Sequence, residues 1–149
     1  MTDQAPSRRH LTPDDLFAIR LVGDLQASPD GARIAWSVVT VDKEQDGYRS
    51  AIWIADADGA NARQLTAGTV RDTSPTWSPD SSTIAFVSNR PYARLPKSDD
   101  APSPEDAPKK GKDAKKPDAP KPLPQIWTIA VDGGEATQAT AHPNGASSP

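Results

Sequence analysis

Two histidines, His10 and His142, are the candidate proton-transfer groups of this chain. Hydrolytic catalysis by a histidine needs a nucleophile held within hydrogen-bond reach of the imidazole. His10 ends the polar leader "MTDQAPSRRH", and His142 lies in the tail "AHPNGASSP" beside an expected Asn144-Gly145 turn. Neither has a serine in a strand-to-helix context. The chain has no cysteine, which excludes thiol nucleophiles, disulfides and thiolate-metal sites. Both histidines are interpreted as surface residues, and the sequence predicts no catalytic residue.

Acidic side chains alternate in "DADGAN", residues 56–61, which is the pattern of a hard-cation site. The spacing of a calcium-binding loop is absent, because no glutamate closes it. A hairpin turn between two strands, with Gly59 at positive φ, explains the segment better. The "DGG" segment, residues 132–134, is likewise interpreted as a hairpin, because no helix follows to bind a phosphate. The sequence therefore predicts no metal site and no cofactor site.

The tryptophans and one arginine are further candidates for a functional role. The four tryptophans are of a type that stacks on ligands, but they recur at matching positions of predicted strands, which favours packing between repeats. They are Trp36, Trp53, Trp77 and Trp127. Arg90 follows a predicted strand and is the candidate for a residue that faces a central tunnel. Asp30 and Asp80 are interpreted as turn residues.

A tripeptide that occurs twice marks the elements that must position these residues. Ser-Pro-Asp occurs at residues 28–30 and 78–80, and each copy is followed four residues later by Ile-Ala and an aromatic residue. Proline presets φ at the second position of a type I turn, and the aspartate bonds nearby backbone N–H groups. Gly31 closes the first turn, and Ser81 takes its place in the second. Each phrase is predicted to be a turn that opens a repeat.

Short strands follow each turn. Residues 33–41, 50–56 and 62–66 are predicted strands, with Ile34, Trp36 and Val38 on one face of the first and Ala35, Ser37 and Val39 on the other. "DADGANARQLT" (56–66) is similar to "AVDGGEATQAT" (130–140), and Ile-Trp precedes both. A period of about 50 residues with four strands is typical of a β-propeller blade.

A helix is predicted over residues 11–23, ending at a glycine. Thr12 is a good N-cap whose hydroxyl accepts a backbone N–H, and Pro13 suits the first helical position. Leu11 and Leu16 hold the positions of a hydrophobic staple.

Residues 91–124 interrupt the second repeat with prolines and charges and almost no large apolar residues. Such a segment buries too little surface to offset its ordering entropy, so a disordered surface loop is predicted. The lysine cluster 109–116 suggests an anionic partner, but neighbouring acidic residues nearly cancel its positive charge.

The net charge of −3 predicts no nucleic-acid partner. No run is apolar enough for a signal peptide or a membrane span, which predicts a cytoplasmic protein without a membrane partner.

Three stretches give the sequence a family resemblance. These are the capped "LTPDDL" before the first Ser-Pro-Asp-Gly, "YRS" before Ile52-Trp53, and "RDTSP" before the second turn. Together they resemble the start of the prolyl oligopeptidase family of serine peptidases, and within it the acylaminoacyl-peptidase and dipeptidyl aminopeptidase-like group. The Ser-Pro-Asp turns alone are shared with TolB-like propellers. The resemblance covers residues 11–140 apart from the proline-lysine insertion.

The resemblance implies an N-terminal β-propeller that gates and positions peptide substrates above a C-terminal α/β-hydrolase domain. In that family the reaction uses a Ser–His–Asp triad, with the serine in a Gly-x-Ser-x-Gly elbow. No such elbow occurs between Met1 and Pro149, so no catalytic residue carries over. The alternative is a TolB-like propeller that binds protein partners. The peptide specificity and the blade count of the parent protein stay open.

The prediction is therefore an all-β partial propeller, about two four-stranded antiparallel blades with a short N-terminal α-helix, truncated before the catalytic domain. Two blades expose faces meant for neighbours, so the missing blades, the hydrolase domain and further copies of the chain are expected partners. The predicted divisions are a leader (1–10), a helix (11–23), blade 1 (24–73), blade 2 (74–140, with the insertion 91–124) and the start of blade 3 (141–149).

Overall fold

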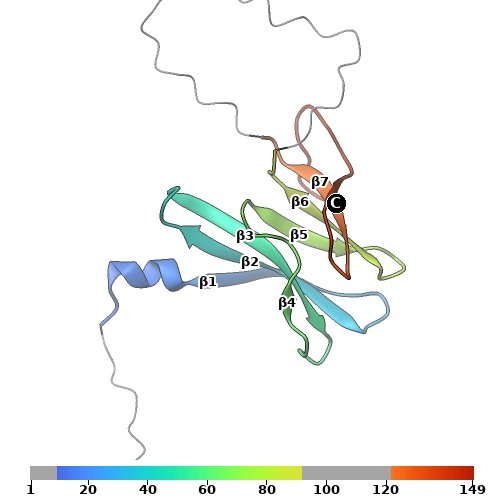
Figure 1. Ribbon diagram of the computed structural model, residues 1–149, viewed down its shortest axis with the longest axis horizontal. Helices are drawn as coiled ribbons and strands as arrows, with labels where there is room; N and C mark the ends of the chain where they lie inside the picture. Colours follow the sequence, from blue (N-terminus) through green and yellow to red (C-terminus); the bar gives the residue numbers. More distant parts are fainter. Residues whose placement is uncertain (1–9, 92–121) are drawn as a thin grey trace, which may run out of the picture.

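Two four-stranded antiparallel sheets make up the part of the chain that the computed structural model describes, residues 10–91 and 122–149 (Figure 1). The strands of each sheet lie side by side in chain order. The first sheet holds β1 (Arg20–Ala27), β2 (Arg33–Asp42), β3 (Gly47–Asp56) and β4 (Arg63–Gln64). The second sheet holds β5 (Asp72–Trp77), β6 (Thr83–Ser88), β7 (Gln125–Ala130) and β8 (Thr137–Gln138). The prediction of two similarly built sheets, a partial propeller, is confirmed.

The same irregularity interrupts the first strand of each sheet. The pairing of β1 with β2 shifts between Gly23 and Gln26, and that of β5 with β6 shifts between Thr73 and Thr76. Asp24 and Ser74, each four residues before a Ser-Pro-Asp turn, have φ of 52° and 53°. A bulge at matching positions shows that the repeat extends to backbone detail.

The Ser-Pro-Asp turns form as predicted. In the first turn the Gly31 N–H donates to the Ser28 carbonyl at 2.9 Å, and the Ala32 N–H donates to Asp30 Oδ1 at 3.0 Å. The second turn has the same bonds one repeat later. Ser81 adopts a φ of 59°, close to the 71° of Gly31, so a residue with a Cβ occupies a left-handed conformation there.

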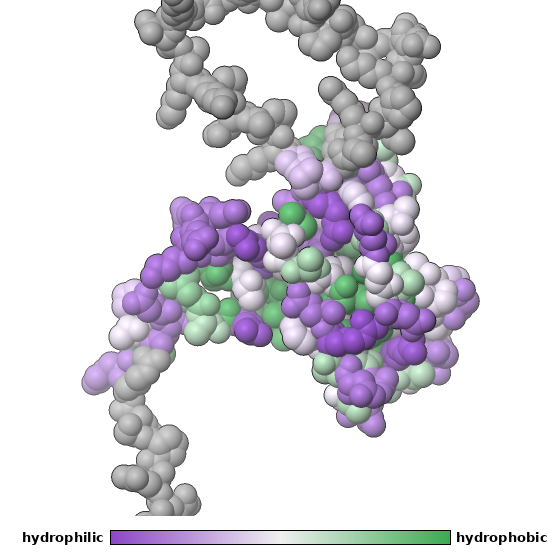
Figure 2. Space-filling model, viewed as in Figure 1, coloured by the Kyte–Doolittle hydropathy of each residue, from purple (hydrophilic) through white to green (hydrophobic). Residues whose placement is uncertain are grey.

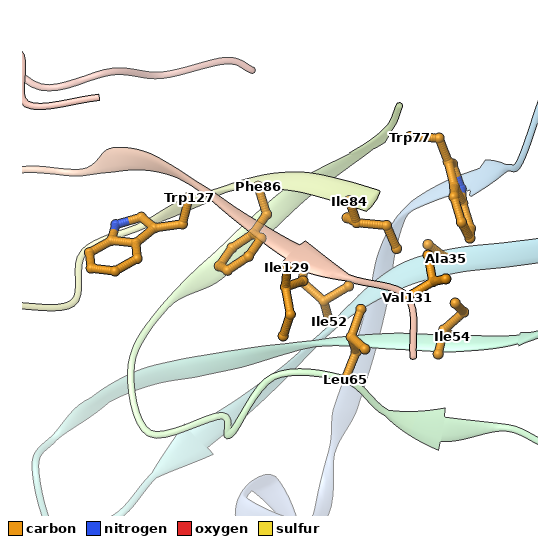
Figure 3. Packing of buried hydrophobic residues seen from close by; sticks show 10 residues of the cluster. All are labelled: Ala35, Ile52, Ile54, Leu65, Trp77, Ile84, Phe86, Trp127, Ile129 and Val131. Atoms are coloured by element: carbon orange, nitrogen blue, oxygen red, sulfur yellow. The ribbon is translucent and has the colours of Figure 1, made fainter. Parts of the chain in front are cut away.

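The core lies between the two sheets, because one face of each packs on the other (Figure 3). Side chains alternate along β2, so Ala35 points to the core while Trp36 points away. Strand β5 contacts β1, β2 and β3 of the first sheet. The buried cluster takes Ala35, Ile52, Ile54 and Leu65 from the first sheet, and Trp77, Ile84, Phe86, Trp127, Ile129 and Val131 from the second.

The predicted α-helix over residues 11–23 is wrong in type and length. A 3-10 helix, η1 (Pro13–Ala18), takes its place. Residues 20–23 lie in β1, where Arg20 pairs with Thr40 and Gly23 with Ser37, so the glycine does not end the helix. Val22 and Gly23 are poor helix formers, and pairing with the long strand β2 bonds the backbone groups of this segment along a strand.

The start of η1 is as predicted, with Thr12 as the N-cap and Pro13 at the first helical position. The Asp15 carboxylate accepts the Thr12 N–H at 2.7 Å and the Thr12 hydroxyl at 3.0 Å. Thr12 and Asp15 thus form a capping box at the start of η1. Leu11 and Leu16 are 89% and 55% exposed, so the expected staple buries little surface.

The boundaries of the repeats are set by the strands. The first sheet begins at Arg20 and the second at Asp72, where the sequence predicted 24 and 74. Almost all of the insertion 91–124 lies outside the described residues. The tail 141–149 contains turns, and its Ala146 N–H donates to the Pro124 carbonyl at 2.7 Å beside β7. In the described ranges no helix has the length and hydrophobicity needed to cross a bilayer.

Candidate functional site at the contact between the sheets

A buried ion pair lies where the two sheets meet. Asp72 opens β5 and is fully buried, and Arg90 follows β6. The Arg90 Nη2 donates to both carboxylate oxygens of Asp72, at 3.0 and 2.9 Å, and its Nε donates to Ser88 Oγ at 2.9 Å. The antiparallel register pairs Asp72 with Ser88, which places a residue two positions after Ser88 within reach. Charge-assisted bonds of this length fix the guanidinium in one orientation.

Two aromatic rings complete the surroundings of Arg90. The guanidinium carbon lies 5.2 Å from the ring centroid of Phe86 and 5.0 Å from that of Trp127. At these distances the ring faces attract the cation. The indole Nε1 of Trp127 is buried and makes no hydrogen bond in the described part of the chain. Figure 3 shows that the Trp127 and Phe86 side chains lie together at one end of the core.

The first sheet also contacts this cluster, through Ser50 of β3. Ser50 Oγ donates to the backbone carbonyl of Asp72 at 2.7 Å, and the Ser50 N–H donates to the Val70 carbonyl at 2.9 Å. A half-open hollow of about 200 Å³ lies beside Arg90 on the same contact. Its lining includes Thr66, which follows β4, and Glu135, which lies between β7 and β8. A guanidinium has N–H donors and no acceptor, so this group can orient a carbonyl or carboxylate.

A second surface feature is an apolar groove between η1 and the first sheet. Its lining includes Leu16 and Ile19, in and directly after η1, and Leu21, Val39 and Tyr48 of the first sheet. Figure 2 shows apolar surface gathered at this end of the first sheet, next to η1. Tyr48 is 60% and Leu21 is 58% exposed, which is unusual for side chains of this size clustered together.

The histidines do not form a catalytic arrangement with the cluster. His142 lies in the tail, where its N–H donates to Gln125 Oε1 at 2.9 Å and its carbonyl accepts from Gln125 Nε2 at 2.8 Å. The His142 ring accepts the Asn144 N–H through Nδ1 at 3.2 Å, in the expected turn. These bonds attach the tail to β7. His10 is exposed at the start of the described residues.

The acidic candidates lie in hairpins, as the sequence predicts. Asp58 accepts the Ala60 N–H at 2.8 Å, and Asp56 accepts from the Asn61 side chain at 2.6 Å. Gly59 and Gly133 have positive φ in the two hairpins. Residues 10–91 and 122–149 contain no group of three or more histidine or acidic side chains placed to hold a metal ion.

The tryptophans divide between the two sides of the sheets. Trp77 and Trp127 pack in the core, and the Trp77 Nε1 donates to the Gln26 carbonyl of the first sheet at 3.3 Å. Trp36 and Trp53 stack on each other at 6.4 Å on the opposite face of the first sheet, away from the core. Packing between repeats is thus seen for two of the four.

Sequence reasoning singled out Arg90 but not its partner Asp72. The feature that could have identified the pair is the strand register. In an antiparallel pair the start of one strand lies beside the end of the next, which brings Asp72 close to Arg90. The bulge between Thr73 and Thr76 hid that register from a simple count.

Known proteins resemble this chain over part of their length. No protein-family model matches it. The peptidase YuxL of Bacillus subtilis, described as uncharacterized, is 33% identical over 142 residues, which is 95% of this chain and 17% of that protein. TolB of Anaeromyxobacter dehalogenans is 51% identical over 50 residues, 34% of this chain and 10% of that protein.

A solved structure shares the fold. The acylaminoacyl peptidase of Pyrococcus horikoshii superposes with a TM-score of 0.53 at 14% identity, over 83% of this chain and 14% of that one. This chain therefore spans less than a fifth of each of these proteins. The chain is a partial β-propeller, homologous to peptidases and to TolB proteins.

Proposed function

We propose that this chain is the N-terminal propeller portion of a cytoplasmic serine peptidase that acts on short or N-acylated peptides. The observation that carries the proposal is the 33% identity to a peptidase over 95% of the chain. This aligned stretch of 142 residues is far longer than the Ser-Pro-Asp turns that are shared with TolB-like propellers. Catalysis belongs to an α/β-hydrolase domain outside these residues, with a serine nucleophile activated by histidine and aspartate.

In this proposal the propeller limits and orients what reaches the catalytic domain. The guanidinium of Arg90 is fixed by Asp72 and two rings, so it is a preorganised donor for a peptide carbonyl or carboxylate. The apolar groove beside η1 is a surface on which a catalytic domain would pack, because Leu16, Ile19 and Tyr48 are exposed there together.

Fluorophosphonate labelling of the natural protein tests the proposal. An antibody raised against the described sheets captures the polypeptide from cells of the source organism, and the captured protein is treated with a fluorophosphonate probe. We expect a labelled polypeptide much larger than 15.8 kDa in the soluble cytoplasmic fraction. Pre-blocking with unlabelled probe is the control and removes the signal. A captured polypeptide that takes no label contradicts the peptidase assignment.

The second candidate function is a TolB-like module that binds protein partners. The 51% identity to a TolB protein over 50 residues favours it for that part of the chain. The same capture separates the two functions. An unlabelled polypeptide that brings down stoichiometric protein partners supports the binding module, whereas a labelled one supports the peptidase.

A further inference from the structure

The hollow of about 200 Å³ beside Arg90 has walls from both sheets. One wall is the segment directly after β4, with Leu65 and Ala67. The other wall is β7, with Ile129, and the segment before β8, with Ala136. Both walls belong to the contact between the two sheets, so the hollow is a feature of that internal contact and not of the outer face of either sheet.

Arg90 brings an unused hydrogen-bond donor to this hollow. A guanidinium carries five N–H groups. Nε donates to Ser88 Oγ, and Nη2 donates to the two carboxylate oxygens of Asp72. Nη1 makes no hydrogen bond to another residue within 10–91 and 122–149. Ser88 and Asp72 are completely buried, whereas Arg90 lines the hollow, so Nη1 is the part of the guanidinium that a ligand in the hollow would meet.

The rest of the lining suits an apolar group. Leu65 and Ile129 are aliphatic members of the core, and Ala67 and Ala136 are small enough to leave space between them. The volume equals the share of about seven water molecules in the liquid. A carboxylate together with a side chain of the size of leucine fills such a space.

We propose that this hollow binds the C-terminal residue of a peptide, with its free carboxylate on Arg90 Nη1 and an aliphatic side chain against Leu65 and Ile129. A charge-assisted bond to a donor that is already held in place needs little further ordering. Only the last residue of a chain carries a main-chain carboxylate directly beside an aliphatic side chain. The proposal rests on the role of Arg90 in the proposed function and names the group that this arginine binds.

Two acidic residues limit the affinity. Asp72 already shares the guanidinium, and Glu135 is exposed on the lining of the hollow. We therefore expect a Kd of roughly millimolar order. Glu135→Gln removes a like charge and should tighten the binding of a carboxylate by about two- to fivefold. A ligand held by apolar contact alone would not respond to this change, so unaltered affinity in Glu135→Gln contradicts the proposal.

Titration of the full ¹⁵N-labelled chain with three small ligands, followed by NMR, is the first test. N-acetylleucine has both groups that the site needs, N-acetylleucinamide lacks the charge, and N-acetylglutamic acid 1-amide has its carboxylate only on the side chain. N-acetylleucine should shift the Arg90 Nε–H and the amides of Glu135 and Ala136 in a saturable way. The other two should bind about tenfold more weakly. No shift with N-acetylleucine, or equal binding of either control ligand, overturns the proposal.

A matched pair of variants tests the position of the ligand. Ala67→Leu fills the hollow without touching the ion pair and should weaken the binding of N-acetylleucine by about tenfold. Ala60→Leu changes an equally exposed alanine in the hairpin between β3 and β4, outside the lining, and should bind like the wild type. An Ala67→Leu chain that binds normally places the ligand elsewhere and contradicts the site.

Fluorophosphonate labelling of the natural protein separates this proposal from the proposed function. A labelled protein whose sheets do not bind N-acetylleucine refutes the carboxylate site and supports the peptidase. Binding of N-acetylleucine to a protein that takes no label supports the site and refutes the peptidase.

Discussion

At the scale of single residues, the two turn aspartates stand out because each carboxylate accepts several hydrogen bonds. The Ser78 hydroxyl, at 2.5 Å, and then the Ser82 hydroxyl and N–H hold the pKa of Asp80 to about 2, below the ordinary value of 3.8. In the first turn the Ser28 hydroxyl and the Ala32 N–H lower the pKa of Asp30. The sequence predicted the turns and the bonds from backbone N–H groups to the aspartates, but it did not predict the bonds from the serine hydroxyls.

The lowered pKa of Asp80 predicts a pH dependence of stability. Because its folded pKa lies below the unfolded value, the ionised carboxylate stabilises the fold above pH 3.8, and this stabilisation is lost as the pH falls toward 2. Asp80→Asn should therefore show a shallower fall in melting temperature across that range than the wild type. Carboxyl ¹³C NMR gives the direct measurement. In Ser78→Ala the Asp80 resonance should titrate at higher pH, and a wild-type titration near 3.8 would show that the turn bonds are not maintained in solution.

At the scale of elements, antiparallel register produces the candidate site. Asp72 begins β5 and Arg90 follows β6, so the pair forms only when the two strands align as they do here. The residue types were visible in the sequence, but the bulge in β5 was not, and a bulge changes which residues lie opposite each other. The pair also links two layers, since Ser50 of β3 bonds the Asp72 backbone.

A double-mutant cycle tests whether this pair is held as one unit. Asp72→Asn leaves a partly buried guanidinium without its counter-charge, and Arg90→Met leaves a buried carboxylate. Each should lower the free energy of unfolding by about 3 kcal/mol, the lower end for a buried pair because Arg90 is 22% exposed. The double variant should lose much less than the sum, as measured by urea denaturation. Additive losses would mean that the two charges do not interact and that Asp72 does not fix the guanidinium of Arg90.

At the scale of the whole molecule, the sequence predicts the strands and turns of each repeat well. It predicts the segment before the first repeat, and the packing of one sheet on the other, less well. Strand β2 and the Asp-Gly hairpins follow from local patterns, because β-branched runs and turn residues act over a few positions. The segment 20–23 was misassigned to a helix, since its strand character comes from pairing with β2. Which face of each sheet covers which neighbour is also a tertiary property. Trp53 and Trp127 both follow an isoleucine, but Trp127 packs in the core and Trp53 lies on the opposite face of its sheet.

The shared core predicts that the two sheets unfold together. Ile52 lies in β3, is fully buried and belongs to the cluster that includes Ile84, Phe86 and Ile129 of the second sheet. Ile52→Val removes one methylene and should cost about 1 kcal/mol. Hydrogen exchange should then show the same loss of protection for amides of β6 and β7 as for those of β2 and β3, because neither sheet retains a core without the other. A second sheet that keeps its wild-type protection would show that each sheet is stable alone, and the contact between them would then be a docking surface instead of a common core.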